Sequence, residues 1–209
     1  EPYRRQRQMC IRDRGNVCYA LIGAAIPLMI SGGFHVDGYM DTMDAFHSYQ
    51  SREKKLEILK DSHIGAFAAI MLALYYMIDI AAISEIHTQK AVSALAAVFF
   101  LARCFSGIAV MTLQPAKKEG LLYTFASSAQ KVMVKAALYF QTVLCVVLML
   151  LVSGWYGAAA IGAVLLSFFY FKKKSYKELG GITGDTAGFF VTVCEAAAAA
   201  AVAVTGYFL

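Results

Sequence analysis

Residues 136–153 read AALYFQTVLCVVLMLLVS, eighteen residues in a row without a charged side chain. As an α-helix this stretch would be about 27 Å long, close to the thickness of the hydrocarbon core of a bilayer. Other apolar runs lie on both sides of it, although the first is short and contains Pro27. We predict an all-α, polytopic integral membrane helix bundle with about six spans. The expected spans are residues 17–30, 64–84, 91–113, 136–153, 155–171 and 186–209.

The composition excludes several other classes of protein. Hydrophobic residues make up 59% of the 209 residues and charged residues only 16%, against about 25% charged in soluble domains. The net charge of +5 comes from short clusters without interleaved aromatic residues, so we expect a lipid bilayer as a partner and no nucleic acid. The five cysteines form no CxxC pair, which argues against a disulfide or zinc framework.

Residues 1–14, EPYRRQRQMCIRDR, differ in character from everything after them. The stretch is too polar for a signal peptide, and it resembles peptide translated from sequencing-adapter DNA. We therefore expect a non-native extension at 1–14 and a single membrane-embedded domain at 15–209, with the true N-terminus missing. The alternative is an ordinary basic arm.

The positive charges alternate with the spans. Three connections, residues 34–63, 114–135 and 172–185, hold twelve lysines and arginines, whereas the two other connections hold only Lys90. Because positively charged loops stay in the cytoplasm, the three rich connections are expected on the cytoplasmic side of a bacterial inner membrane. The twelve are Arg52, Lys54, Lys55, Lys60, Lys117, Lys118, Lys131, Lys135, Lys172, Lys173, Lys174 and Lys177.

The first rich connection carries Asp37, Asp41 and Asp44, spaced i, i+4 and i+7. On a helix they fall on one face, where like charges repel one another unless a cation lies among them. Magnesium prefers oxygen ligands of this kind, often together with substrate phosphates. The alternative is an acidic, solvated helix face. Asp61 would either cap the next helix or join these acids at a Mg²⁺ site.

A second polar motif, GGITGDTAGFF at 180–190, opens the last span. Thr183, Gly184 and Asp185 are expected at the helix N-terminus, where free N–H groups favour an anion. Close helix packing around the glycines and a simple capping role for Asp185 are the alternatives.

Three ionisable residues are expected at membrane depth, where charge is expensive and marks function or pairing. Arg103 could bind phosphate or pair with Glu195, and Glu195 lies about three turns beyond Asp185. Asp79, near the outer end of its span, is expected to reach water. His35, next to Asp37, could act as a base, whereas His47 and His63 read as ordinary polar loop residues.

The motifs GGFHVDGYMDTMDAF, KDSHIGAF and GGITGDTAG occur at 32–46, 60–67 and 180–188. Together they resemble the cobalamin synthase family, also called adenosylcobinamide-GDP ribazoletransferase, whose pattern runs GGxHxDGxxDTxDG, KDSRIGxxG and GGxTGDxxGxxxE. The resemblance covers nearly everything after residue 15. Three departures stand out: His63 replaces an arginine, Ala45 a glycine, and Thr192 a frequent glutamate.

The resemblance implies a membrane enzyme that uses Mg²⁺ to join adenosylcobinamide-GDP to α-ribazole or its 5′-phosphate, with release of GMP. Its cation would stabilise the phosphates in a phosphoryl-type transfer. A homo-oligomer is left open. The metal-site candidates are Asp37, Asp41, Asp44 and Asp61; the catalytic candidates are Asp44, His35 and Asp185; the substrate-binding candidates are Arg103, Thr183, Gly184, Glu195 and Lys60.

The alternative functions are a CDP-alcohol phosphotransferase of lipid synthesis and a cation transporter. A CDP-alcohol phosphotransferase would carry DGxxAR, but Tyr39, Met40, Asp41 and Thr42 follow Asp37-Gly38 here. A cation transporter would place its acidic groups near the middle of several spans, whereas most of these lie at the expected cytoplasmic ends.

Overall fold

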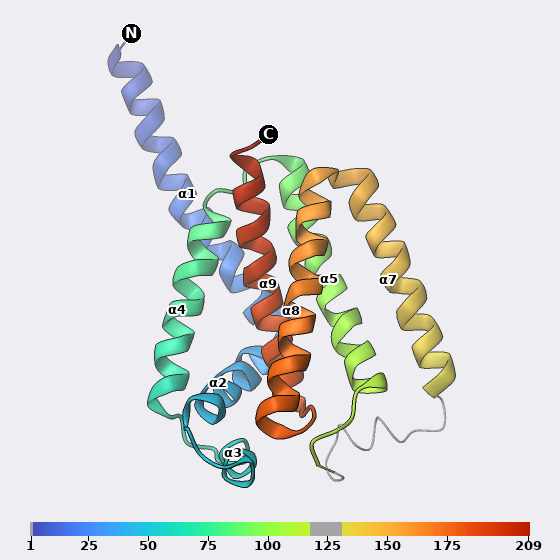
Figure 1. Cartoon of the computed structure of the whole chain (residues 1–209). Helices are drawn as coiled ribbons and strands as arrows, with labels where there is room; N and C mark the ends of the chain where they lie inside the picture. The colour runs from blue at the N-terminus through green and yellow to red at the C-terminus, as the bar shows by residue number, and fades with distance from the viewer. Residues whose placement is uncertain (1, 118–130) are drawn as a thin grey trace.

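The computed structural model describes residues 2–117 and 131–209, which form helices joined by short connections (Figure 1). Lys118, one of the predicted cytoplasmic bases, lies outside the described residues. The helices are α1 (Pro2–Ser31), α2 (Phe34–His47), α3 (Arg52–Ile58), α4 (Ala66–Ile83), α5 (Gln89–Thr112), α7 (Lys131–Ser153), α8 (Trp155–Leu179) and α9 (Gly184–Gly206).

The predicted helical membrane fold is confirmed. In the described part of the chain five helices, α4, α5, α7, α8 and α9, are long and apolar enough to cross a membrane, and residues 15–31 with α2 make a sixth if this bent pair is one span. Helix α8 continues past residue 171, the end of the expected span, as far as Leu179. Its last two turns carry lysines and follow the apolar part, and Gly180, at φ 71°, ends the helix.

Helix α9 is the centre of the bundle. Of its most apolar 18 residues 67% are buried, against 17–33% in the four other spanning helices. It packs against α2, α4, α5 and α8, whereas α7 lies at the edge against α5 and α8 (Figure 1). Its run of alanines, residues 196–201, lets the neighbouring backbones come close, as small residues do in membrane bundles.

A pair of glycines turns the chain between α1 and α2. Gly32 and Gly33 both have positive φ, 61° and 82°, a conformation that glycine adopts at little cost. The Gly33 N–H bonds to the Leu28 carbonyl at 3.1 Å, and α2 leaves the turn at 94° to the preceding helix. As a result α2 crosses one end of the bundle beneath the other helices (Figure 1).

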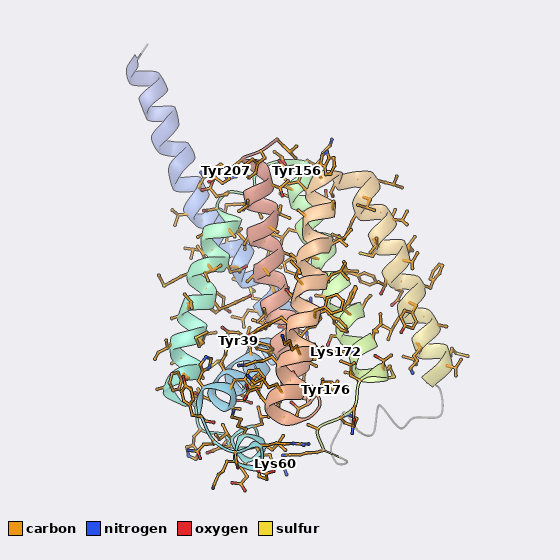
Figure 2. All side chains as sticks on the ribbon, in the orientation of Figure 1. Tyr39, Lys60, Tyr156, Lys172, Tyr176 and Tyr207 are labelled. Carbon is orange, nitrogen blue, oxygen red and sulfur yellow. The ribbon has the colours of Figure 1, made fainter. Side chains whose placement is uncertain are left out.

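The polar connections meet at that same end. Helices α2 and α3, the end of α5 and the α8–α9 junction lie together there, whereas the α4–α5 and α7–α8 connections lie at the opposite end (Figure 1). Lys60 and Tyr176 lie near the first end, and Tyr156 and Tyr207 at the other (Figure 2). The described parts of the base-rich connections are thus gathered at one end of the bundle.

The segment after α5 is held against the α8–α9 junction by backbone contacts. Ile182 donates its N–H to the Gln114 carbonyl at 3.0 Å and accepts the Ala116 N–H at 2.8 Å. A Cβ on Gly181 would lie 2.6 Å from the Gln114 carbonyl oxygen, so only glycine allows this approach. The contact brings Lys117 to the polar end of the bundle.

Candidate functional site

The predicted acidic helix face exists, and it borders a cavity. Asp37 and Asp41 on α2 line a cavity of about 320 Å³ together with Lys60 and Asp61 from the connection between α3 and α4. Three carboxylates and one ammonium group therefore share a single space at the polar end of the bundle. The structure thus brings Asp37, Asp41 and Asp61 to one cavity, although α2 and residues 59–64 are separate elements.

Helix α2, which lines the cavity, also crosses α9, and this crossing depends on two glycines. A Cβ on Gly38 would lie 2.8 Å from the Asp185 carbonyl oxygen, and a Cβ on Gly188 would lie 3.1 Å from the His35 carbonyl oxygen. The Thr192 hydroxyl, which replaces the frequent glutamate, donates to that His35 carbonyl at 3.1 Å. Close packing thus brings Asp185 to the α2 acids.

The charges at this crossing interact. Asp41 interacts with Asp37, Asp44 and Asp185, and Asp185 also interacts with Lys117. Like charges so close together repel one another, so this arrangement favours a cationic ligand or a bound cation in the cavity.

Asp44 faces helix α4. Its Oδ2 accepts the Gly65 N–H at 2.7 Å and its Oδ1 accepts the Ala68 N–H at 2.8 Å. The alternative in which Asp61 caps this helix is therefore wrong, because Asp44 takes the free N–H groups first. The sequence predicts Asp44 as a metal-site residue, and no local pattern indicates its contact with the start of α4.

Asp61 is instead held by the residue two positions later. Its Oδ1 accepts the His63 N–H at 3.1 Å and contacts His63 Nδ1 at 2.6 Å. The side-chain hydrogen bond lowers the pKa of Asp61 and raises the pKa of His63. The side chains of Asp61 and His63 are 56% and 90% exposed, so Asp61 remains accessible to a ligand in the cavity.

The start of α9 is capped by Thr183. Its hydroxyl accepts the Thr186 N–H at 3.1 Å, and Thr186 Oγ1 accepts the Thr183 N–H at 2.8 Å. The alternative of Asp185 as the N-cap is thus wrong, and Asp185 lies in the first turn. A side chain on Gly184 would meet open space, so Gly184 is not required there by packing.

Arg103 and Glu195 pair with each other inside the bundle. Arg103 Nη1 donates to Glu195 Oε1 at 2.5 Å and to the Phe99 carbonyl at 2.6 Å. Neither residue lines the acidic cavity. His35 is also outside its lining and interacts with the charge of Arg103. None of these three candidates therefore lines the acidic cavity.

Two residues differ from their sequence-based interpretation. Asp79 was expected to reach water, but it is only 4% exposed and interacts with Glu195, because α4 packs against α9. The sequence predicts Lys117 only as a base in a cytoplasmic loop, yet its Nζ donates to the Leu56 carbonyl at 2.8 Å and it interacts with Asp185. Neither position could be inferred from local sequence, since each depends on long-range packing.

The donor chemistry of the cavity fits a hard divalent cation, which takes carboxylate oxygens. Among the residues that the structure describes, however, no three acidic, histidine or cysteine side chains already form a group that could hold a metal ion. Binding a cation here would therefore require the carboxylates to move toward one another or toward a substrate phosphate.

Comparison with known proteins identifies the family. A sequence model described as CobS, cobalamin-5-phosphate synthase, matches residues 11–203. The chain is 42% identical over 190 residues to an adenosylcobinamide-GDP ribazoletransferase of Lachnoclostridium phytofermentans, covering 91% of this chain and 72% of the relative. It is 33% identical over 174 residues to the enzyme so named from Clostridium botulinum strain Alaska E43, covering 81% and 68%.

A more distant relative carries the same name. The adenosylcobinamide-GDP ribazoletransferase of Escherichia coli K12 is 28% identical over 178 residues, which covers 84% of this chain and 71% of the relative. No solved structure matches the chain. The family match covers both glycine–aspartate motifs and the helices between them. The protein therefore belongs to the CobS family, membrane-embedded transferase enzymes of cobalamin biosynthesis.

Proposed function

We propose that this protein transfers the adenosylcobinamide phosphate from adenosylcobinamide-GDP to α-ribazole or its 5′-phosphate, in a Mg²⁺-dependent reaction that releases GMP. The names of its relatives support these substrates. The observation that carries the proposal is the cavity lined by Asp37, Asp41 and Asp61 together with Lys60. Carboxylates beside a lysine are what a cation-assisted transfer between phosphates requires.

In this reaction a ribose hydroxyl oxygen that is free in both α-ribazole and its 5′-phosphate forms a bond to the phosphorus that carries cobinamide. The bond between that phosphorus and the GMP oxygen breaks, and GMP leaves with the electron pair. When bound, Mg²⁺ would neutralise the diphosphate and the departing GMP. Asp37, Asp41 and Asp61 would hold the cation, and Lys60 would contact a phosphate oxygen as a mobile positive charge.

The hydroxyl proton needs an acceptor, and Asp185 is the candidate best supported by its surroundings. It lies in the first turn of α9, against Gly38 and close to the charge of Asp37. Like Asp185, His35 lies outside the lining of the cavity, but its charged neighbour is Arg103 and not an aspartate of α2. Both oxygens of Asp44 already accept backbone N–H groups. We therefore assign proton acceptance to Asp185.

We further propose that the acidic cavity faces the cytoplasm across a bacterial inner membrane. The support is the distribution of bases along the sequence, with twelve in the three connections expected on the cytoplasmic side and Lys90 alone in the two others. Positive loops are retained in the cytoplasm, which is also where two large polar substrates would be available.

The test is GMP release by the purified protein in detergent, measured by chromatography. With adenosylcobinamide-GDP, α-ribazole and Mg²⁺ we expect release that depends on ribazole, and a fall of at least about 100-fold after chelation with EDTA. Excess Mg²⁺ should restore the rate. Release that continues in EDTA would contradict the metal dependence, and turnover of a CDP-alcohol in place of the cobinamide substrate would contradict the reaction.

A further inference from the structure

Asp44 closes the start of a helix that is far from it in the sequence. The N-cap of α4 is Gly65, which offers no side chain to the free N–H groups of the first turn. Asp44 supplies the missing acceptor from α2, with one oxygen on the Gly65 N–H and the other on the Ala68 N–H. An acceptor at this position normally belongs to the N-cap residue itself.

The space for this carboxylate exists because residue 65 is glycine. A Cβ on Gly65 would lie 2.5 Å from Asp44 Oδ1, a severe overlap. The backbone at Gly65 is extended, with φ −84° and ψ 169°, a conformation in which serine is a good N-cap. Glycine is thus not needed for its backbone freedom here. It is needed because Asp44 occupies the position of a capping side chain.

The contact also fixes one wall of the acidic cavity. Asp37 and Asp41 precede Asp44 on α2, and Lys60 and Asp61 lie just before the capped end of α4. The bridge from Asp44 to α4 therefore joins the two elements whose side chains line the cavity. We propose that Asp44 is a positioning residue, that its capping of α4 fixes residues 59–65 along the cavity, and that it is neither a ligand of the cation nor the proton acceptor.

This inference rests on the proposed function only where it predicts a change in GMP release. A pair of substitutions tests it. In Asp44→Ala, a serine at residue 65 can restore the cap from within α4 itself, through its own hydroxyl. Serine is a weak ligand for Mg²⁺ or Mn²⁺ and a poor base, so Asp44→Ala/Gly65→Ser replaces the cap without replacing the carboxylate.

Four proteins are compared: wild type, Asp44→Ala, Gly65→Ser and the double variant. The thermal midpoint, Mn²⁺ affinity and ribazole-dependent GMP release are measured for each. Asp44→Ala should lose about tenfold in Mn²⁺ affinity and in GMP release, as expected when a supporting residue is removed. Gly65→Ser alone should lower the thermal midpoint because of the overlap, but in the Asp44→Ala background it should raise it.

The double variant should recover Mn²⁺ affinity and GMP release to within about threefold of wild type. The inference is overturned if Gly65→Ser has the same effect in both backgrounds. It is equally overturned if the thermal midpoint returns while Mn²⁺ affinity and GMP release do not, since Asp44 would then act chemically. If the wild type releases no GMP, the proposed function fails, but the midpoint and the Mn²⁺ affinity still decide the role of Asp44.

Discussion

Asp41→Asn should reduce ribazole-dependent GMP release by at least about 100-fold while the protein stays folded. Asparagine has the shape of aspartate without its charge. Asp41 lines the acidic cavity, and its charge interacts with three other aspartates. Because these like charges repel one another, removing one should leave the thermal midpoint unchanged or slightly higher. Rate and thermal midpoint are measured on the same preparation in detergent.

A matched control separates this effect from a general loss of negative charge. Glu57 on α3 has a side chain that is 69% exposed and paired with Lys54, and exposed pairs of this kind contribute little to stability. Glu57→Gln should therefore change neither rate nor thermal midpoint. If Asp41→Asn were as active as Glu57→Gln, Asp41 would have no part in the reaction.

Gly38→Ala should have the second large effect, on packing and activity together. The added methyl would meet the Asp185 backbone, with its carbon 2.8 Å from the carbonyl oxygen and 3.0 Å from Cα. Backbone atoms cannot move away as the end of a side chain can, so α2 must shift from α9. We expect a loss of about 1–3 kcal/mol in the free energy of unfolding, and slower GMP release because Asp185 moves relative to the α2 acids.

Gly162→Ala is the control for this substitution. Gly162 lies within α8, and a Cβ there would meet open space. Alanine favours a helix over glycine by roughly 0.5–1 kcal/mol, so this variant should be as stable as wild type or more stable, with unchanged activity. The free energy of unfolding of both variants is measured by replacing a mild detergent stepwise with a denaturing one. Equal stability of the two would contradict the close crossing of α2 and α9.

The sequence predicted the elements whose signals are local. Apolar runs of about 20 residues identify spans because a bilayer fixes their length, and the i, i+4, i+7 spacing of Asp37, Asp41 and Asp44 correctly indicated a helix with an acidic face. The right-angle turn at Gly32 and Gly33 was not predicted, because a glycine pair allows many backbone conformations and tertiary packing selects one.

Local sequence could not predict which groups the polar side chains bond to in the folded protein. Only Asp61 lies just before the second span in the sequence, yet the fold shows that the distant Asp44 accepts the free N–H groups at the start of that span. The pairing of Arg103 with Glu195 was one of two alternatives, since a phosphate and a carboxylate offer a guanidinium similar geometry. Asp79 was misjudged because its depth depends on how α4 packs against α9.

Three of the predicted metal-site residues, Asp37, Asp41 and Asp61, surround one cavity, and cation binding there is the central claim. The most direct test is titration of the purified protein with Mn²⁺, followed by electron paramagnetic resonance, with Mg²⁺ as competitor. We predict saturable Mn²⁺ binding that Mg²⁺ displaces, and at least about tenfold weaker binding in Asp41→Asn and Asp61→Asn, with Glu57→Gln unchanged. Binding of equal strength in all four proteins, or no saturable binding in the wild type, would contradict the account.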